Sequence, residues 1–447
     1  MFALVPTLHV QLASSHRGIL AERMRDSVAV FFAAPEQIRN RDVHHDYRQE
    51  SDFFYLTGFE EPESVLVVAP HRAVGDRTAI FLRKRDLEAE VWDGERMGVE
   101  RAPEALGVDK AFEFKSLATE LPKWLAGARR LYFSLGRNAE DDEVVVAAMR
   151  AARMQRKTGA ETPGDLLDPE DLLHEQRLIK SPEAIASMRR AATLANIGHR
   201  KAMAVSRPGV FEFQLQAAME YEWGVRGARR TAYSSIVGSG PNACVLHYRS
   251  NARQMEAGDL VLIDAGCEVD YFASDVTRTF PVSGKFTEPQ RRLYALVLAA
   301  QKAGIDRCRS GYSFEQVHEA TVRVLTEGLV ELGLLIGPVE DRIKDEGFKR
   351  YYMHRTSHWL GMDVHDVGRY YVGGTSRALE PGMTLTVEPG LYISSRDELA
   401  PEEYRGIGIR IEDDVLVTDG APDVLSAAIP KEIDDLEALI GTEALSM

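Results

Sequence analysis

The stretch Arg207-Pro208-Gly209-Val210-Phe211-Glu212-Phe213-Gln214-Leu215 returns later in the chain as Arg309-Ser310-Gly311-Tyr312-Ser313-Phe314-Glu315-Gln316-Val317. The arginine, the first glycine and the glutamine of the second copy each lie 102 positions after those of the first. A long predicted helix precedes each copy, and these helices open at Ser181-Pro182-Glu183 and Thr287-Glu288-Pro289, with a capping hydroxyl and an early proline. Another helix and then strands follow each copy. Such an internal repeat predicts a domain of two similar halves.

Each half continues into apolar strands that carry acidic side chains. In the first half, the strand Leu260 to Gly266 contains Asp264, and the returning strand Tyr271 to Phe280 contains Asp275. In the second half, Met383 to Gly390 contains Glu388, and Ile407 to Val417 contains Glu412. A single acid in an apolar strand usually faces solvent. Four acids paired within two repeated hairpins instead predict that the carboxylates converge.

Four converging carboxylates require positive charge between them, because burying each unpaired ion costs several kcal/mol. Two divalent cations would match the four negative charges, and the neutral imidazole of His358 would add a ligand. Oxygen-dominated ligation with one nitrogen favours Mn²⁺, with Co²⁺, Zn²⁺ or Fe²⁺ as alternatives. Two metals with shared carboxylates can hold a hydroxide between them and polarise a carbonyl, as binuclear hydrolases do.

His358 belongs to the segment His354 to Asp366, which also contains His365. The three histidines are separated by four and then seven residues, so they would share one face of a helix. Gly361 and the absence of a helix-favouring run argue against a helix, and no His-Glu-x-x-His zinc motif is present. The segment is therefore predicted to form the wall of a pocket.

Composition limits the function classes. The 447 residues suggest two domains, and the net charge of −15 argues against non-specific nucleic-acid binding. Three widely spaced cysteines, Cys244, Cys267 and Cys308, are expected to be thiols in a reducing compartment. We find no signal-peptide pattern at the N-terminus, and the apolar run from Val28 to Ala34 is too short to cross a bilayer. We therefore expect a cytoplasmic protein that has neither a membrane nor a nucleic acid as its partner.

The first part of the chain reads as a mixed α/β domain without a catalytic cluster. We expect helices over Leu20–Phe32 and Asp141–Ala152, and strands over Ser64–Val68, Thr78–Leu82 and Leu131–Leu135. The acidic, proline-containing segment Asp165–Asp171 is expected to be a linker. The predicted domains are residues 1–173 and residues 174–447.

With its five candidate ligands in order, the sequence resembles the aminopeptidase P family. These ligands are Asp264, Asp275, His358, Glu388 and Glu412. The resemblance covers essentially the whole chain, and includes Tyr47-Arg48-Gln49 and Phe53 to Phe59 in the first domain. It implies an α/β (α+β) protein with an N-terminal α/β domain and a C-terminal pita-bread fold, which prolidase and methionine aminopeptidase share. It also implies metal-dependent hydrolysis of the N-terminal Xaa-Pro bond, with a metal-bridging hydroxide as nucleophile.

The resemblance further implies a role for each site residue. Asp264 would hold one metal, His358 and Glu388 the other, and Asp275 and Glu412 would bridge both. Glu388 would also act as general base. The residues that would contact the substrate or stabilise the oxyanion are His247, His354, His365, Tyr392 and Arg410. Trp92 resembles a residue that family members donate to a neighbouring subunit's site, which implies a homodimer or homotetramer, and Asp42 would join the site from the N-terminal domain.

Several alternatives remain at this point. His247 would be a core histidine if its apolar neighbours pack around it, and Arg410 would also neutralise Glu412. Arg355 stands where the family commonly has glycine, so it would either narrow the pocket or point to solvent. The alternative activities are those of prolidase, which cuts only Xaa-Pro dipeptides, and of the metal-free creatine amidinohydrolase. A further alternative is a binding protein that has lost catalysis. The metal-free hydrolase and the binding protein are disfavoured because all five ligands are present.

Overall fold

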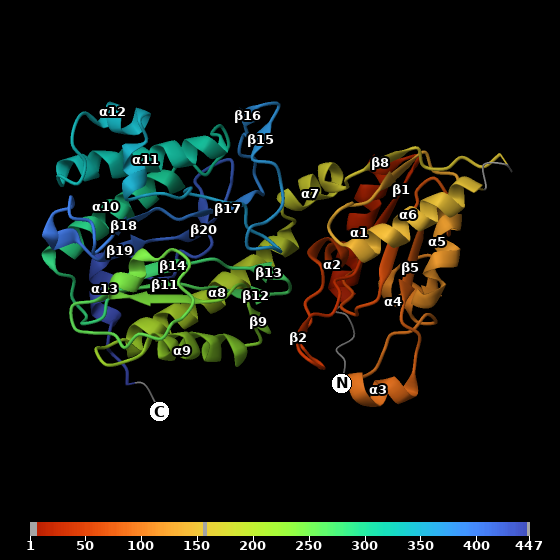
Figure 1. Ribbon diagram of the computed structural model, residues 1–447, viewed down its shortest axis with the longest axis horizontal. Helices are drawn as coiled ribbons and strands as arrows, with labels where there is room; N and C mark the ends of the chain where they lie inside the picture. Colours follow the sequence, from red (N-terminus) through yellow and green to blue (C-terminus); the bar gives the residue numbers. More distant parts are fainter. Residues whose placement is uncertain (1–6, 155–158, 445–447) are drawn as a thin grey trace. The chain divides into compact units, whose positions relative to one another are not determined.

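The computed structural model describes residues 7–154 and 159–444, and it divides into two compact units. The first unit ends at Gln176 and the second begins at Arg177. Both are mixed α/β structures (Figure 1). Within the described residues, no helix combines the length and the apolar character needed to cross a membrane.

The N-terminal unit is built on a six-stranded sheet with the strand order β6-β5-β4-β1-β7-β8. The strands are β1 (Ser27–Phe32), β4 (Val65–Val68), β5 (Thr78–Leu82), β6 (Lys110–Glu113), β7 (Arg130–Tyr132) and β8 (Asp165–Leu167). Alternate residues of β1 enter different cores, since successive side chains of a strand point to opposite faces. Val28 and Val30 pack with helices α5 (Leu117–Leu125) and α6 (Ala139–Met154), whereas Ala29 and Phe31 pack with α1 (Thr7–Met24), α2 (Ser51–Thr57) and α4 (Ala102–Leu106). The sheet is therefore covered by helices on both faces.

The helix predicted over Leu20–Phe32 is wrong, because two elements share that range. Helix α1 ends at Met24, Arg25 turns the chain with φ of 44°, and strand β1 begins at Ser27. A strand buried on both faces has a continuous apolar run that mimics the inner face of a helix. The strands expected over Ser64–Val68 and Thr78–Leu82 are confirmed, and α6 contains the helix expected over 141–152. The strand expected over 131–135 is shorter, since β7 ends at Tyr132.

The segment Asp165–Asp171 is not a linker. Its first three residues form β8, which pairs in parallel with β7, and Leu166 packs against the core of that sheet face. Helix α7 (Glu170–Leu178) follows at once. The acidic composition suggested a linker because a short strand at the edge of a sheet leaves its polar side chains in solvent.

The C-terminal unit contains the two halves that the repeat predicts. Helices α8 (Pro182–Val205) and α9 (Glu212–Gly224) of the first half correspond to α10 (Glu288–Ile305) and α11 (Phe314–Glu331) of the second. The repeated glutamine has the same task in both, because its side-chain oxygen accepts a backbone N–H at the start of the helix. Gln214 accepts from Phe211 at 2.9 Å, and Gln316 accepts from Ser313 at 2.8 Å. Figure 1 shows the strands of this unit between the two helix pairs.

Antiparallel strands carry the acidic positions of each half. The first half has the sheet β10 (Ile236–Ser239), β11 (Leu260–Asp264) and β14 (Thr277–Pro281). The second has β17 (Thr384–Val387), β20 (Asp413–Leu416) and β21 (Asp423–Val424), beside the pair β18 (Gly390–Ile393) and β19 (Ile407–Arg410). The halves meet where the Glu412 N–H donates to the Thr277 carbonyl at 3.0 Å. Each predicted metal-binding carboxylate therefore lies at the end of a strand or between two strands.

Shorter elements complete both units. In the N-terminal unit they are β2 (Ile38–Asn40), β3 (Val43–His44) and α3 (Leu87–Asp93). In the C-terminal unit they are β9 (Arg230–Thr231), β12 (Cys267–Val269), β13 (Phe272–Ala273), β15 (Tyr371–Val372), β16 (Thr375–Ser376), α12 (Val339–Lys344) and α13 (Ile433–Leu439). The three cysteines are free thiols; Cys267 and Cys308 are buried and Cys244 is partly buried.

Candidate metal centre

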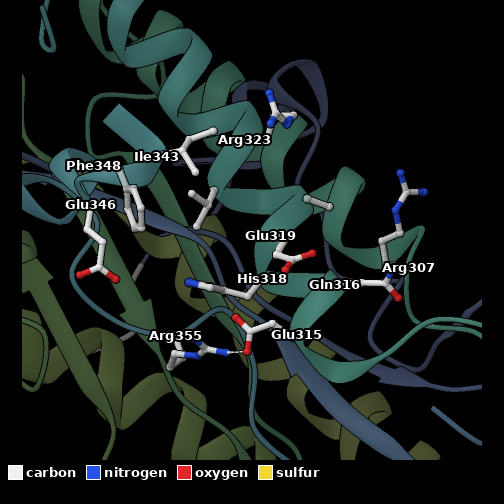
Figure 2. Close-up of a pocket in the computed structure, with 12 residues that line it drawn as sticks. Arg307, Glu315, Gln316, His318, Glu319, Arg323, Ile343, Glu346, Phe348 and Arg355 are labelled. Atoms are coloured by element: carbon white, nitrogen blue, oxygen red, sulfur yellow. Dashed lines mark hydrogen bonds and ion pairs between the residues drawn. The ribbon is translucent and has the colours of Figure 1, made fainter. Parts of the chain in front are cut away.

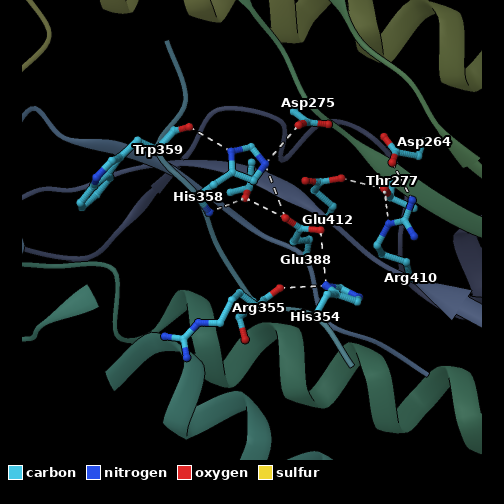
Figure 3. A network of polar contacts seen from close by, with 12 residues as sticks. Asp264, Asp275, Thr277, His354, Arg355, His358, Trp359, Glu388, Arg410 and Glu412 are labelled. Atoms are coloured by element: carbon cyan, nitrogen blue, oxygen red, sulfur yellow. Dashed lines mark hydrogen bonds and ion pairs between the residues drawn. The ribbon is translucent and has the colours of Figure 1, made fainter. Parts of the chain in front are cut away.

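A cavity of about 530 Å³ lies beside helix α11 and is distinct from the acidic cluster (Figure 2). Its lining includes Glu315, His318 and Arg355, and Arg355 is the one member that comes from the segment His354 to Asp366. The guanidinium of Arg355 donates to Glu315 at 2.5 Å. In Figure 3 this side chain points away from the carboxylates, and the Arg355 carbonyl alone faces His354. The long cation therefore does not narrow the space around the acids.

The five predicted ligands lie together in the C-terminal unit (Figure 3). His358 Nε2 is 3.4 Å from Asp275 Oδ2 and 3.5 Å from Glu388 Oε1. One ligand atom each from Asp275, His358 and Glu412 lie within 4.8 Å of one another, a spacing at which a single ion can reach all three. Asp264 is linked to Asp275 through Tyr233, whose hydroxyl lies 2.6 Å from Asp264 and 2.5 Å from Asp275.

The orientation of His358 suits a metal ligand. Its Nδ1–H donates to the Trp359 carbonyl at 2.9 Å, so in the neutral ring Nε2 carries the lone pair. Burial disfavours the imidazolium, but Asp275 and Glu388 raise the pKa of His358 to about 9. A cation at this position would replace that proton, because metal ligands bind in their deprotonated form.

Two of the carboxylates are buried, those of Asp264 and Glu388 are partly buried, and all four repel one another, which tests whether cations fit the site. Asp275 and Glu412 are 5% and 2% exposed. Burial and the neighbouring acids raise the pKa of Glu412 well above its usual value, and they raise that of Glu388 to about 7. Arg410 contributes one positive charge against four carboxylates. A donor set of oxygens and one imidazole that is short of positive charge fits divalent cations.

A chain of hydrogen bonds runs from Asp264 to His354. Arg410 donates to Asp264 Oδ2 at 2.6 Å, to Thr277 Oγ1 at 3.1 Å and to the Tyr392 hydroxyl at 3.0 Å. The Tyr392 hydroxyl lies 2.9 Å from His354 Nε2, and His354 Nδ1 lies 2.8 Å from the Arg355 carbonyl. Burial and the charge of Arg410 lower the pKa of His354 to about 3, so its ring is neutral. Arg410 reaches Glu412 indirectly, through the Thr277 hydroxyl, which donates to Glu412 at 2.7 Å.

The remaining predicted residues are accessible. His365 lies edge-to-face with His358, at 4.3 Å between ring centroids, and is exposed. His247 is exposed too, so the alternative that it is a core histidine is wrong. Trp92 and Asp42 belong to the N-terminal unit, where Trp92 is 87% exposed on α3 and Asp42 is exposed in the turn between β2 and β3.

Sequence reasoning missed several residues that contact the ligand set, Tyr233 and Asp414 among them. Tyr233 lies in an irregular segment after β9, where neither spacing nor periodicity distinguishes it from any other tyrosine. Asp414 is 1% exposed, and its carboxylate accepts the backbone N–H of Asp275 at 3.2 Å. The run Glu412-Asp413-Asp414 was a usable signal, since three consecutive acids in an apolar strand cannot all face solvent. Asp413 points the other way, toward Arg278 at 2.7 Å.

Comparisons with known proteins agree with this arrangement. Residues 186–419 match metallopeptidase family M24, and residues 14–132 match the N-terminal domain of aminopeptidase P. The chain is 46% identical to the Xaa-Pro aminopeptidase of Escherichia coli strain K12, over 95% of this chain and 96% of that protein. It is 35% identical to human Xaa-Pro aminopeptidase 3, over 93% of this chain and 81% of that protein.

The fold of this chain is also similar to solved structures of aminopeptidase P. Pseudomonas aeruginosa aminopeptidase PepP superposes with a TM-score of 0.94 at 48% identity, over 96% of this chain and 97% of that one. Zinc-substituted E. coli aminopeptidase P in complex with product superposes with a TM-score of 0.93 at 45% identity, over 96% and 98% of the two chains.

Proposed function

This chain belongs to metallopeptidase family M24, and on that premise we propose that it is an Xaa-Pro aminopeptidase. It hydrolyses the bond between the N-terminal residue of a peptide and a proline at the second position. The observation that carries the proposal is the cluster of Asp275, His358 and Glu412, whose ligand atoms lie within 4.8 Å of one another. We assign residues 1–173 to the N-terminal domain and residues 174–447 to the catalytic pita-bread domain.

The enzyme depends on divalent metal, and we propose two ions per subunit, most suitably Mn²⁺. The proposed ligands are Asp264, Asp275, His358, Glu388 and Glu412. The number of ions follows from charge, since four carboxylates balance two divalent cations. When bound, such a pair of cations lowers the pKa of water and polarises a carbonyl oxygen.

We assign the proton transfer to Glu388. Its Oε1 lies 3.5 Å from His358 Nε2, and its Oε2 lies 3.8 Å from His354 Nδ1. It therefore stands between a proposed ligand and a proposed substrate-side histidine. From there it can take a proton from the attacking water and return it to the leaving proline nitrogen.

Substrate contacts are proposed for the accessible histidines and for the Arg410 network. His247 and His365 are exposed, so they can meet the substrate without rearrangement of the core. Arg410, through Tyr392, holds His354 as a neutral ring. A dedicated site is needed because the Xaa-Pro bond has no N–H and restricts the residue before it.

An oligomer is proposed from the surface of helix α3. Leu87, Val91 and Trp92 are 75%, 81% and 87% exposed, and the helix buries no residue. A short helix with three exposed large apolar side chains is typical of a contact surface. A homodimer or homotetramer would cover it and would place Trp92 against a neighbouring subunit. We place the protein in the cytoplasm, which agrees with its three free thiols.

A comparison of peptide lengths tests the proposed activity. With Mn²⁺, kcat/KM for an Xaa-Pro-Yaa tripeptide should exceed that for the matching Xaa-Pro dipeptide at least about tenfold, which is ~1.4 kcal/mol of transition-state binding. Release of free Xaa, measured by chromatography, gives both values. Equal or faster cleavage of the dipeptide would identify a prolidase. Full turnover after dialysis against EDTA, without added metal, would exclude the metal-dependent mechanism.

Alanine in place of Arg355 should leave the activity almost unchanged. The Arg355–Glu315 pair is partly exposed, with 51% and 26% of the two side chains accessible, and the Arg355 side chain points away from the carboxylates of the metal centre (Figure 3). Such pairs contribute about 0–1 kcal/mol. We expect a change of less than about threefold in kcat/KM across a series of Xaa-Pro-Yaa peptides that differ in Xaa. A large change confined to bulky Xaa residues would show that the guanidinium enters the substrate pocket.

A further inference from the structure

A cluster of four charged side chains adjoins the loop that carries His358 and His365. Lys180 donates to Asp366 Oδ2 at 2.9 Å, and Arg177 donates to Asp366 Oδ1 at 2.7 Å. Arg177 also donates to Asp363 at 2.8 Å. Burial alone would raise the pKa of Asp366, but Lys180 and Arg177 hold it below its usual value, so the carboxylate stays ionised. The cluster is neutral overall.

Three of the four side chains are buried, and the fourth, that of Asp363, is 37% exposed. The side chains of Lys180 and Asp366 are each 1% exposed, and that of Arg177 is 3% exposed. Buried ion pairs of this kind add little net stability, because desolvation costs about as much as the attraction returns. The Lys180–Asp366–Arg177 ion pairs instead hold Asp366 in a fixed position, and their place in the fold indicates which part of the site depends on that position.

One carbonyl connects the cluster to the metal centre. The backbone N–H of Asp366 donates to the Trp359 carbonyl at 2.9 Å. The same carbonyl accepts the Nδ1–H of His358 at 2.9 Å. A displacement of Asp366 would therefore move the acceptor that sets both the tautomer and the direction of the His358 ring.

Gly361 shows how closely the loop surrounds this carboxylate. A Cβ atom at position 361 would lie 2.1 Å from Asp366 Oδ2 and 2.9 Å from Lys180 Cε. The Gly361 carbonyl also accepts the N–H of Ala273, two residues before Asp275, at 2.8 Å. The loop thus packs against both the Asp366 carboxylate and the strand before Asp275, and a side chain at position 361 would displace the carboxylate.

We propose that Asp366, held by Lys180 and Arg177, is a positioning residue that fixes His358 for metal binding through the Trp359 carbonyl. The inference rests on the proposed function in one respect, the assignment of His358 as a ligand. In this proposal Asp366 touches neither metal nor substrate. Partners of this kind, which orient a ligand from behind, typically contribute 10- to 100-fold to metal affinity or activity.

The test compares Asp366→Asn with Glu437→Gln. Glu437 serves as the control because it is likewise a carboxylate held by two cations: it is 7% exposed and accepts from Lys285 at 2.8 Å and Arg291 at 2.6 Å, although these two partners are more exposed than those of Asp366. Within the part of the chain that the structure describes, the Glu437 side chain contacts Lys285, Arg291 and the Phe286 backbone N–H, and none of these belongs to the metal centre. Both variants should lower the thermal unfolding midpoint. Asp366→Asn alone should weaken Mn²⁺ binding by about 10- to 100-fold, measured by competition with a fluorescent chelator. Wild-type Mn²⁺ affinity in Asp366→Asn, or equal losses in both variants, would overturn the proposal.

A second variant keeps the test open if Asp366→Asn fails to fold. Lys180→Met leaves Asp366 paired with Arg177, so this variant should weaken Mn²⁺ binding less than Asp366→Asn does. Lys180→Arg keeps the positive charge and should bind Mn²⁺ with wild-type affinity. Unchanged affinity in Lys180→Met would count against the proposal. Metal affinity is measured without peptide, so the result is independent of whether the wild-type enzyme prefers Xaa-Pro-Yaa peptides. A failure of the proposed function would instead appear in the wild-type peptide assay.

Discussion

Asparagine in place of Asp275 should lower kcat/KM for Xaa-Pro-Yaa peptides by at least about a thousandfold, which is ~4 kcal/mol of transition-state stabilisation. Asp275 contacts both the histidine of the proposed ligand set and the tyrosine that links it to Asp264. Its carboxylate lies 3.4 Å from His358 and 2.5 Å from the Tyr233 hydroxyl, and its ligand atom groups with that of Glu412. Asparagine has nearly the same shape but lacks the charge, so the fold should survive while metal binding is lost.

Three measurements together check this result. Bound metal is counted by mass spectrometry, kcat/KM is measured with saturating Mn²⁺, and folding is followed by circular dichroism. Asp259→Asn is a suitable control, since Asp259 lies in the same half of the unit and its side chain contacts Arg253 and the Glu256 backbone N–H rather than a proposed ligand. If Asp275→Asn keeps full metal content and wild-type turnover, the assignment of Asp275 as a ligand is incorrect.

The ligand set could be predicted from sequence because a run of apolar residues predicts a buried strand, and an acidic residue in or beside such a strand is conspicuous. Asp264 and Glu388 interrupt apolar runs at their ends, and Asp275 and Glu412 fall between two short strands. A buried charge in such a place has to be compensated, so the positions of the acids predicted that cations bind there. The internal repeat, in which an arginine, a glycine and a glutamine recur 102 positions apart, placed the two acidic pairs at the same stage of two similar halves.

Residues that act through the fold could not be predicted in this way. Tyr233 reaches Asp264 and Asp275 from a segment with no periodicity, and Lys180 meets Asp366 across 186 positions of sequence. Neither contact follows from local pattern, because each depends on how distant segments pack. The helix expected over Leu20–Phe32 failed for a related reason. A strand covered on both faces loses the alternation that identifies strands in sequence.

Glutamine in place of Glu388 should lower kcat by about 10²- to 10⁴-fold, the usual contribution of a general base. The amide keeps the size of the side chain and can still accept from Thr386 Oγ1, which lies 3.4 Å from Glu388 Oε1. It cannot take a proton at neutral pH. KM should change little, because the Arg410, Tyr392 and His354 hydrogen bonds do not involve the Glu388 side chain.

Glu388 is also a proposed ligand, so the measurement has to separate the two roles. Glu388→Gln is titrated with Mn²⁺ until its metal content equals that of the wild type, and kcat is then compared at that occupancy. A deficit of at least about a hundredfold at equal occupancy assigns proton transfer to the carboxylate, since that is the lower end of what a general base supplies. Recovery of wild-type kcat on full loading would leave Glu388 as a ligand alone, and the proton acceptor would then have to be sought among the histidines around it.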